Sequence, residues 1–287
     1  MREVFPGVRH LAVLADVGYH AAVLEMRDVQ TIARRLGLDV ITLVMRSKPD
    51  GHTLFVASNG PILLGPMIST NPPYHWNEAF IPVSSLSFAP TLLLVRKNMP
   101  VKNVKEFIKY ARQHSQEVTV GFGGAGSINN LVSEMMQQVT GAKWIGINFR
   151  GNAPLMNDLI GEHIDAAFIQ PVDALPQAQS GTVRVLAVIA DGRLAAIPEV
   201  PTMREAGFPT IVGLTFNGIF APKGTPKSTI NKLSKTNKEA LGKPSAIDQF
   251  EKLGSQARGS TPEEFTKFMT EQTAIWSEVV KKRQHPH

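Results

Sequence analysis

Short apolar runs alternate with amphipathic stretches along the chain, and this alternation restricts the possible folds more than any other feature. Amphipathic helices are expected over 21–35, over 104–111 and in the C-terminal stretch that begins at Pro262. Strands are expected at 10–17, 38–45, 53–58, 91–96, 118–122, 144–149, 164–169 and 183–190. Strands that alternate with helices in this way are typical of an α/β fold with mostly parallel sheets.

Two of the expected helices carry start signals. Asn103 precedes the helix expected over 104–111, with Glu106 three residues later. Thr261 precedes the C-terminal helix, with Glu264 three residues later. Both pairs have the capping-box spacing. The apolar stripe of the C-terminal helix is then predicted to consist of Phe265, Phe268, Met269, Trp276 and Val280. Its Met and Trp content indicates core packing.

Length and composition exclude several classes of protein. A chain of 287 residues exceeds one typical core and suggests two lobes. It has no cysteine, so disulfides and thiolate sites are excluded. The net charge of +6 is scattered, which favours small anions over nucleic acid. No apolar run is long enough to span a bilayer, and residues 1–20 do not resemble a signal peptide.

The most informative segment is 118–136, where a strand, a glycine-rich turn and a helix follow one another. Gly121, Gly123 and Gly126 fit the G-x-G-x-x-G pattern of dinucleotide sites. Such a site requires an acidic residue about twenty positions later, to hold the ribose hydroxyls. The chain has Arg150 in that region and no carboxylate, so a dinucleotide-binding enzyme is the weaker alternative. No lysine follows Gly126 as a P-loop requires.

A simpler interpretation is an anion site made of backbone amides. Ser127 is placed to cap the helix, and the first N–H groups of a helix have no internal partner. Two more helix starts are expected after strands, one near Pro154 and one at Gln170–Pro171. In an open α/β sheet these loops lie at the carboxyl ends of the strands, where ligands bind. A tight turn without a ligand is the alternative for the glycine segment.

Catalytic chemistry finds no support in the sequence. There is no H-E-x-x-H or paired metal-ligand spacing, and the histidines are isolated. A nucleophile elbow of the form G-x-S-x-G is also absent. We therefore predict a non-enzymatic protein with no cofactor and no metal site.

A series of ordered motifs resembles the Bug (TctC-like) binding proteins of tripartite tricarboxylate transporters. The series runs from about Pro49 to Lys281. It includes PDGHTLFVASNG (49–60), YHWNEAFIPVS (74–84), MPVKNVKEFIKYAR (99–112), INFRGNAPLMNDLIGEHID (147–165) and GIFAPKGTPKSTINKL (218–233). The glycine loop and VLAVIADGRLAAIPEVPTMREAGFP (185–209) match the family in the same order.

The resemblance implies a fold like type II periplasmic binding proteins, with two α/β lobes joined by a hinge and a ligand cleft between them. Lobe 1 would comprise 1–97 and 219–287, and lobe 2 would comprise 98–218. Such a protein is an extracytoplasmic, periplasmic solute receptor that binds a small carboxylate (a di- or tricarboxylate, an acidic amino acid or an aromatic acid). Its partners would be that ligand and membrane transporter subunits, with no nucleic acid, and the receptor would be a monomer.

The resemblance also implies a set of ligand contacts in the loops that follow strands. The predicted ligand-binding residues are Ser58, Asn59, Gly60, Gly124, Gly126, Ser127, Asn130, Arg150, Gly151, Gln170 and Asp173. Asn130 stands where the family usually has His, and Phe149-Arg150 replaces Tyr-Lys. Gln170 lies close to a position where Asp is common, so an altered ligand specificity is expected. Asn130 and Arg150 can also be interpreted as a helix-surface amide and a solvated cation.

The N-terminal segment departs most from the family. Residues 1–46 lack the Pro-Gly-Gly-rich loop that supplies part of the carboxylate site, and resemble a piece of a different ABC-type substrate-binding protein. Asp16, Val17, Gly18 and Tyr19 would then occupy the place of the missing loop. A fusion, a rearranged gene or an engineered chain would explain this departure. A receptor remnant that no longer binds its ligand is therefore a third functional hypothesis.

Overall fold

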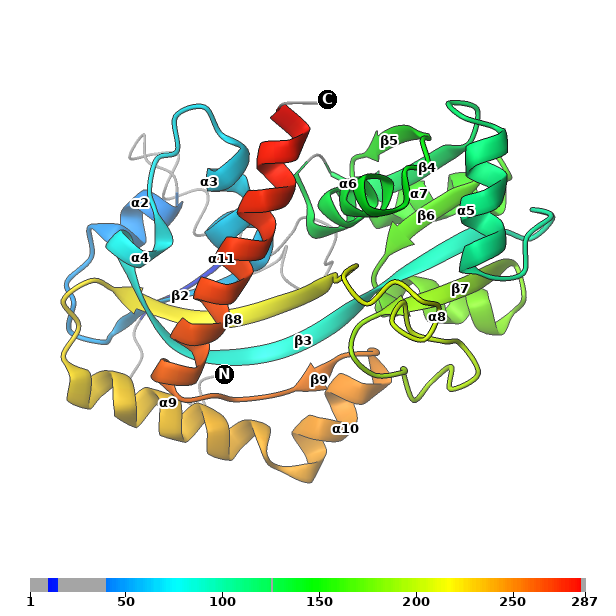
Figure 1. Cartoon of the computed structure of the whole chain (residues 1–287). Coiled ribbons are helices and arrows are strands. Elements are labelled where there is room, and N and C mark those ends of the chain that lie inside the picture. Colours follow the sequence, from blue (N-terminus) through cyan, green and yellow to red (C-terminus); the bar gives the residue numbers. More distant parts are fainter. Residues whose placement is uncertain (1–9, 15–39, 125, 285–287) are drawn as a thin grey trace. The chain divides into compact units, whose positions relative to one another are not determined.

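The computed structural model describes residues 10–14, 40–124 and 126–284, which fall into two compact units. Unit 1 holds the residues up to Phe88, together with Phe216–Glu251 and Gln256–Glu278. Unit 2 holds Ala89–Thr215, Lys252–Ser255 and the residues from Val279 on. Each unit combines a sheet with helices, as Figure 1 shows, so the predicted α/β class is confirmed. The expectation of mostly parallel sheets is wrong, because β3 and β8 run antiparallel to their neighbours and make both sheets mixed.

The sheet of unit 1 contains one parallel pair among antiparallel neighbours. Its strands are β1 (His10–Leu14), β2 (Thr53–Ser58), β8 (Leu214–Pro222), the first half of β3 (Phe80–Arg96) and β9 (Gln256–Ala257). β1 is parallel to β2, β2 is antiparallel to β8, and β9 is antiparallel to β3. The helices are α2 (Val40–Met45), the π-helix η1 (Gly60–Leu64), α3 (Gly65–Ile68), α4 (Trp76–Ala79), α9 (Lys227–Leu241), α10 (Pro244–Lys252) and most of α11 (Pro262–Gln284).

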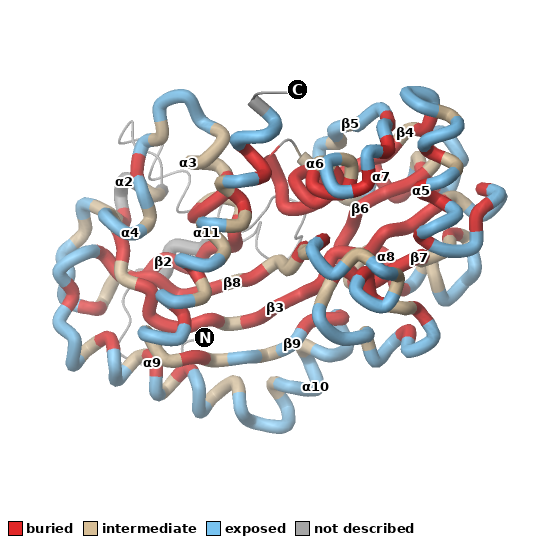
Figure 2. The backbone as a smooth tube through the Cα atoms, in the orientation of Figure 1, coloured by how far each residue is buried: buried red, intermediate tan, exposed pale blue. Residues whose placement is uncertain are grey.

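Aromatic side chains fill the core of unit 1. The Phe55 and Phe80 rings stack at a centroid distance of 5.2 Å, and Phe220 packs against Phe265 at 5.3 Å. Phe265 comes from α11, and Phe265, Met269 and Trp276 of the predicted stripe are buried in unit 1. Val280 is buried as well but belongs to unit 2, and Phe268 is only partly buried. Its capping box also forms, because Thr261 Oγ1 accepts from the Glu264 N–H at 3.1 Å and Glu264 accepts from the Thr261 N–H at 2.8 Å. β2 and β3 are mostly buried, whereas α9 has an exposed face and α10 has no buried residue (Figure 2).

A buried polar cluster in unit 1 seats the segment that leads into α11. Ser84 Oγ donates to the Ser260 carbonyl at 2.8 Å and accepts from the Ser260 N–H at 3.0 Å. The amide of Asn237 donates to Ser84 Oγ at 2.8 Å, and Ser234 Oγ donates to the Ser260 carbonyl at 2.9 Å. Hydrogen bonds thus satisfy polar groups that burial would otherwise penalise.

Unit 2 has three parallel strands beside the second half of β3. They are β6 (Ala166–Ile169), β4 (Thr119–Gly123) and β5 (Ile145–Phe149), and β7 (Val183–Ile189) pairs with β3 in the antiparallel direction. Its helices are α5 (Val104–Gln113), α6 (Ile128–Thr140), α7 (Asn152–Ile160) and α8 (Pro171–Gln179). The predicted buried face of α5 is confirmed, since Val104, Phe107, Ile108 and Ala111 are all buried.

The strand predicted at 38–45 is wrong, because Val40–Met45 forms the helix α2. A short apolar run does not by itself distinguish a strand from a helix, and the surrounding topology decides. β2 already pairs with β1 in parallel, and neighbouring parallel strands require a crossover connection, usually a helix. α2 packs on β1 and β2 as part of that crossover. Of the predicted strand 10–17, only His10–Leu14 is described, and the predicted helix 21–35 and Asp16–Tyr19 lie outside the described residues.

The strand predicted at 91–96 is the end of a longer one, since β3 runs over 17 residues from Phe80 to Arg96. Pro82 and Pro90 make its first half look like a loop in the sequence, because proline lacks the N–H that a sheet needs. The predicted strands at 53–58, 118–122, 144–149, 164–169 and 183–190 are confirmed with small shifts of their ends.

Candidate anion site at three helix starts

Three parallel strands of unit 2 end at one edge of the sheet, and a helix begins after each of them. Gly123 lies opposite Phe149 in the β4–β5 pair, and Phe122 lies opposite Phe168 in the β4–β6 pair. The strands therefore end side by side. The helices α6, α7 and α8 begin directly after Ser127, Gly151 and Gln170, which are their N-cap residues. The three helix starts that the sequence predicted for the site in unit 2 therefore lie together along one edge of the sheet, the one formed by the carboxyl ends of these strands.

The glycine loop between β4 and α6 is shaped by positive φ angles and by close packing. Gly124 and Gly126 have φ values of 103° and 72°, a conformation that favours glycine. At Gly123 a Cβ atom would lie 2.3 Å from Asn152 Oδ1, so glycine leaves the space that the Asn152 side chain occupies. Ser127 Oγ accepts from the Asn130 N–H at 3.2 Å and caps the helix as predicted.

A reciprocal pair of side-chain amides lies at the centre of this edge. Asn129 Nδ2 donates to Gln170 Oε1 and Gln170 Nε2 donates to Asn129 Oδ1, each at 3.2 Å. Asn129 Oδ1 also accepts from Thr91 Oγ1 at 3.1 Å, and Gln170 Nε2 lies 3.4 Å from Thr215 Oγ1. Asn129 and Gln170 are buried, so these contacts fix α6 relative to α8.

The same network reaches α7 through Asn152. Its Nδ2 atom donates to Gln170 Oε1 at 3.1 Å and to Asp173 Oδ2 at 2.7 Å. Asp173 lies in the first turn of α8, where a carboxylate is favoured by the helix dipole. One connected set of side chains therefore holds the starts of all three helices, and we call it the amide network (Thr91, Asn129, Asn152, Gln170, Asp173 and Thr215).

Hydrogen bonds within the protein already use several of the loop amides. Gly126 N–H donates to Asn130 Oδ1 at 3.0 Å, and Gly124 N–H donates to the Phe122 carbonyl at 3.1 Å. The backbone N–H groups of Ile128 and Asn129 belong to the first turn of α6 and have no partner among the described residues. Both residues are at most 3% exposed. These two amides are the donors that the start of α6 offers to an anion.

The other residues predicted from the sequence divide into three groups. Ser58, Asn59 and Gly60 lie in unit 1, where β2 ends and η1 begins, and Ser58 and Asn59 are buried. Gly151 has a φ of 127° and precedes α7 directly. Arg150 is exposed, and no hydrogen bond or ion pair joins its guanidinium to another described residue.

Asn129 and Asn152 are the residues that sequence reasoning missed. Each is an asparagine in the first turn of a helix that follows a predicted strand. Asparagine is uncommon in helix interiors and common at helix starts, so that position is the signal that could have identified them.

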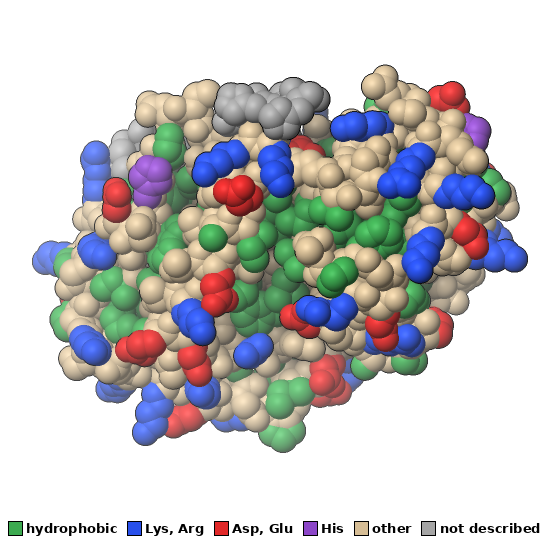
Figure 3. Space-filling model, in the orientation of Figure 1, with side chains coloured by type: hydrophobic (Ala, Val, Ile, Leu, Met, Phe, Trp, Pro, Cys, Tyr) green, Lys and Arg blue, Asp and Glu red, His purple; other side chains and the backbone are tan. Residues whose placement is uncertain are grey.

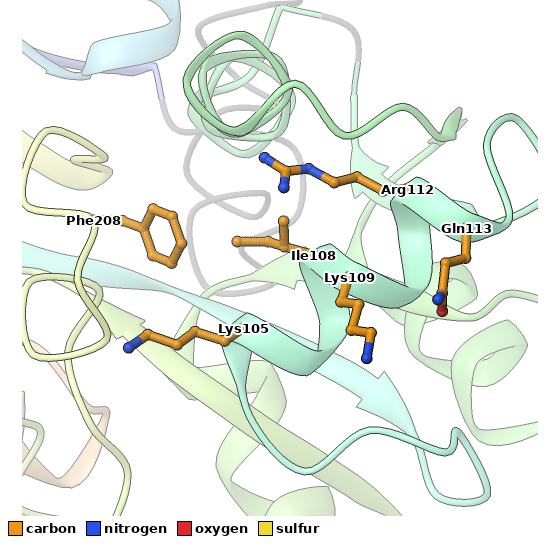
Figure 4. A pocket seen from close by; sticks show the side chains of 6 residues that line it. All are labelled: Lys105, Ile108, Lys109, Arg112, Gln113 and Phe208. Atoms are coloured by element: carbon orange, nitrogen blue, oxygen red, sulfur yellow. The ribbon is translucent and has the colours of Figure 1, made fainter.

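A separate hollow of about 410 Å³ lies on the surface of unit 2, between α5 and Phe208. Figure 4 shows Phe208 and Ile108 facing each other across it, with Arg112 beside them and the Lys109 ammonium pointing away. Lys105, Lys109 and Arg112 form its cationic rim. Over the face drawn in Figure 3, cationic side chains are interspersed with Asp and Glu.

Over 10–14, 40–124 and 126–284, no cluster of three or more His, Asp or Glu side chains is suited to hold a metal ion. Across the same part of the chain, no helix is both long enough and apolar enough to cross a bilayer.

A family model described as "Tripartite tricarboxylate transporter family receptor" matches residues 37–285. The chain belongs to this receptor family. Members of the family are substrate-binding receptors, which agrees with the resemblance noted in the sequence.

Individual members of the receptor family are similar at moderate identity. The protein BugT of Bordetella pertussis is 29% identical over 237 residues, which is 82% of this chain and 73% of BugT. A protein encoded between tcbD and tcbE in Pseudomonas sp. strain P51 is 27% identical over 239 residues, which is 83% of this chain and 71% of the relative.

Solved structures of similar receptors share the fold. A periplasmic transporter superposes with a TM-score of 0.79 at 28% identity, over 96% of each chain. MatC from Rhodopseudomonas palustris, solved with bound malate, has a TM-score of 0.74 at 27% identity, over 95% of this chain and 98% of MatC. The periplasmic binding protein BugD has a TM-score of 0.73 at 26% identity, over 95% and 96%. The predicted periplasmic-binding-protein fold is therefore confirmed.

Proposed function

We propose that this receptor binds a small carboxylate reversibly in the periplasm and delivers it to the membrane subunits of a tripartite tricarboxylate transporter. The observation that carries the proposal is the common edge of unit 2 where three helices begin and the Ile128 and Asn129 amides have no partner. Helix N-termini attract anions through these amides and through the helix dipole. The bound malate in MatC, which is 27% identical, supports a dicarboxylate as the first ligand to test.

The amide network supports the proposal because it fixes the donors before a ligand arrives. A preorganised site avoids the entropy cost of ordering loops and side chains on binding. Charge-assisted hydrogen bonds contribute about 1.5–3 kcal/mol each. A few of them can therefore sustain a micromolar Kd, which corresponds to a binding free energy of about −8 kcal/mol. The residues that shape this edge are Gly124, Gly126, Ser127, Asn130, Gly151, Gln170 and Asp173. We also propose that the ligand contacts Ser58, Asn59, Gly60 and Arg150.

Thermal-shift measurements followed by calorimetry test the proposal. L-malate, citrate, glutamate and benzoate are titrated separately into the full chain, with NAD as the probe for the dinucleotide alternative. We expect a saturable rise in Tm with at least one carboxylate and none with NAD. A folded sample that responds to no carboxylate would support the hypothesis of a receptor remnant that does not bind.

A proline substitution tests the amide donors directly. Ile128→Pro removes one N–H at the first helical position, where proline is tolerated. Ser127 before it is extended (φ −68°, ψ 162°), as a residue preceding proline prefers to be. We expect affinity for the binding carboxylate to fall by about tenfold or more.

The matched control is Val104→Pro, at the first position of α5. Val104 is as buried as Ile128, and Asn103 before it is also extended (φ −152°, ψ 172°). The control is expected to lower stability to a similar degree and leave affinity unchanged. Equal losses of affinity in both variants would contradict the proposed role of the α6 amides.

A further inference from the structure

Glu134 is a mostly buried carboxylate one turn beyond Asn130 on α6. Its side chain is 19% exposed. Oε1 accepts from Asn130 Nδ2 at 3.0 Å and lies 3.5 Å from Arg283 Nη1 of α11. Oε2 is buried and has no hydrogen-bond partner among the described residues. A carboxylate with an unsatisfied oxygen is unfavourable in such a place, so its presence calls for an explanation.

The neighbour of Glu134 connects it to the glycine loop. Asn130 donates through Nδ2 to Glu134 and accepts through Oδ1 from the Gly126 N–H at 3.0 Å. An ionised carboxylate has no proton to donate, so only the NH₂ end of the Asn130 amide can face it. The oxygen of that amide must then face Gly126. The Gly126 N–H can only donate, so Gly126 and Glu134 favour the same orientation of the Asn130 amide, and Glu134 helps to hold the Asn130 oxygen against the loop.

We propose that Glu134 is a positioning residue for the glycine loop, acting through Asn130. In this arrangement the protein itself uses the Gly126 N–H, and the Ile128 and Asn129 amides are the ones left for a ligand. The part that concerns a ligand rests on the proposed function, whereas the effect on the loop does not. Asn130 is then a brace for the loop and not a direct ligand contact.

Protonation of Glu134 provides a natural probe of this connection. Burial raises the pKa of Glu134 above its ordinary value, and the charge of Arg283 and the hydrogen bond from Asn130 oppose that rise. Arg283 of α11 is the charged group that faces Glu134 in the described part of the chain. A neutral carboxyl accepts a weaker hydrogen bond than a carboxylate, so Asn130 and the Gly126 N–H should respond when Glu134 titrates.

The experiment is a pH titration of the ligand-free chain, followed by ¹H–¹⁵N NMR. We expect the Gly126 amide and the Asn130 side-chain amide to shift with a common midpoint above the ordinary glutamate pKa. Glu134→Gln keeps the acceptor oxygen and should abolish that titration without moving the loop. Glu134→Met removes the acceptor, and exchange of the Gly126 amide with solvent should accelerate by about tenfold.

The matched control is Glu239→Gln on α9, an exposed carboxylate that pairs only loosely with Lys235 at 3.9 Å. It should leave the Gly126 signals unchanged. A Gly126 amide that does not titrate in the natural chain overturns the inference, and it does so even if Glu134→Met fails to fold.

A final measurement separates this inference from the proposed function. In calorimetry with L-malate, Glu134→Met is expected to weaken binding by about threefold to tenfold. If the natural chain does not bind L-malate while Gly126 still titrates with Glu134, the choice of ligand is wrong and the positioning role stands. If malate binds but the Gly126 amide signal does not shift as Glu134 titrates, the positioning role is wrong and the receptor function stands.

Discussion

Two regions of unit 2, the helix starts and the hollow beside α5, present hydrogen-bond donors of different kinds. At the helix starts the donors are backbone amides of buried residues, held by the amide network. Around the hollow beside α5 the donors are charged side chains on exposed residues, Lys105, Lys109 and Arg112, of which Arg112 already donates to the Thr140 carbonyl. Fixed dipoles in a dry site act at full strength, whereas flexible surface charges are screened by water and salt. The comparison indicates why a small anion is expected at the first region and not at the second.

Removing the centre of the amide network should have the largest effect. Asn129→Leu deletes both hydrogen bonds to Gln170 and the one from Thr91. The buried Gln170 then keeps only its contacts with Asn152 and Thr215. We expect the free energy of unfolding to fall by about 2–4 kcal/mol and carboxylate binding to be lost. Urea denaturation and calorimetry measure the two effects. Asn231→Asp, on an exposed face of α9, is the control that should change neither.

Crowding the glycine loop should have a somewhat smaller effect. In Gly123→Ala the new Cβ would meet Asn152 Oδ1 at 2.3 Å, so the Asn152 side chain must move and its hydrogen bonds to Gln170 and Asp173 are disturbed. We expect a loss of about 1–3 kcal/mol in the free energy of unfolding, with weaker binding of the carboxylate. Gly192→Ala is the matched control, because a Cβ there meets nothing within 4 Å. A Gly123→Ala protein as stable as the control would contradict the close packing of α7 on β4.

Neutralising the cationic rim should leave ligand binding almost unchanged. The double variant Lys105→Gln and Lys109→Gln removes two exposed charges that line the hollow and make no recorded contact with the amide network. We expect less than about a twofold change in carboxylate affinity, with the same weak dependence on salt as the natural chain. A large loss of affinity would move the anion site from the helix starts to the hollow.

The exposed pair of Arg193 and Glu205 should show the smallest effect. The Nε–H of Arg193 is shared between the two carboxylate oxygens of Glu205, each 3.0 Å away. The Arg193 guanidinium, followed by the Thr202 N–H, holds the pKa of Glu205 below its ordinary value of 4.5. A lowered pKa contributes stability above the ordinary value, and that contribution disappears as the pH falls through the pKa of the folded state. Comparison of natural and Glu205→Gln proteins by thermal unfolding should show a small difference at pH 7 that vanishes in acid.

The sequence was sufficient for the helix starts but not for what joins them. Ser127, Gly151 and Gln170 were predictable because a cap, a glycine or a proline follows an apolar strand at each place. The pairing of Asn129 with Gln170 was not predictable, because it links side chains 41 residues apart and depends on the order of the strands.

The fold class followed from periodicity, whereas two elements depended on tertiary context. The run 38–45 was expected to be a strand because it is short and apolar, but Val40–Met45 is helical in the connection from β1 to β2. The first half of β3 was missed because Pro82 and Pro90 suggest a loop. In both segments the pairing and packing of neighbouring strands decide the secondary structure, and the local sequence preference does not.

The serine and asparagine cluster at Ser260 determines how the C-terminal helix is turned about its own axis. Because Ser84 Oγ forms hydrogen bonds with both the N–H and the carbonyl of Ser260, the helix that begins two residues later has a fixed starting point. Inserting one residue between Ser260 and Phe265 would rotate everything beyond it by about 100°. Phe265, Met269 and Trp276, now buried in unit 1, would then swing toward water. A few hydrogen bonds of serine and asparagine thus fix the rotation of α11, and with it the orientation of the large apolar surface that the helix buries.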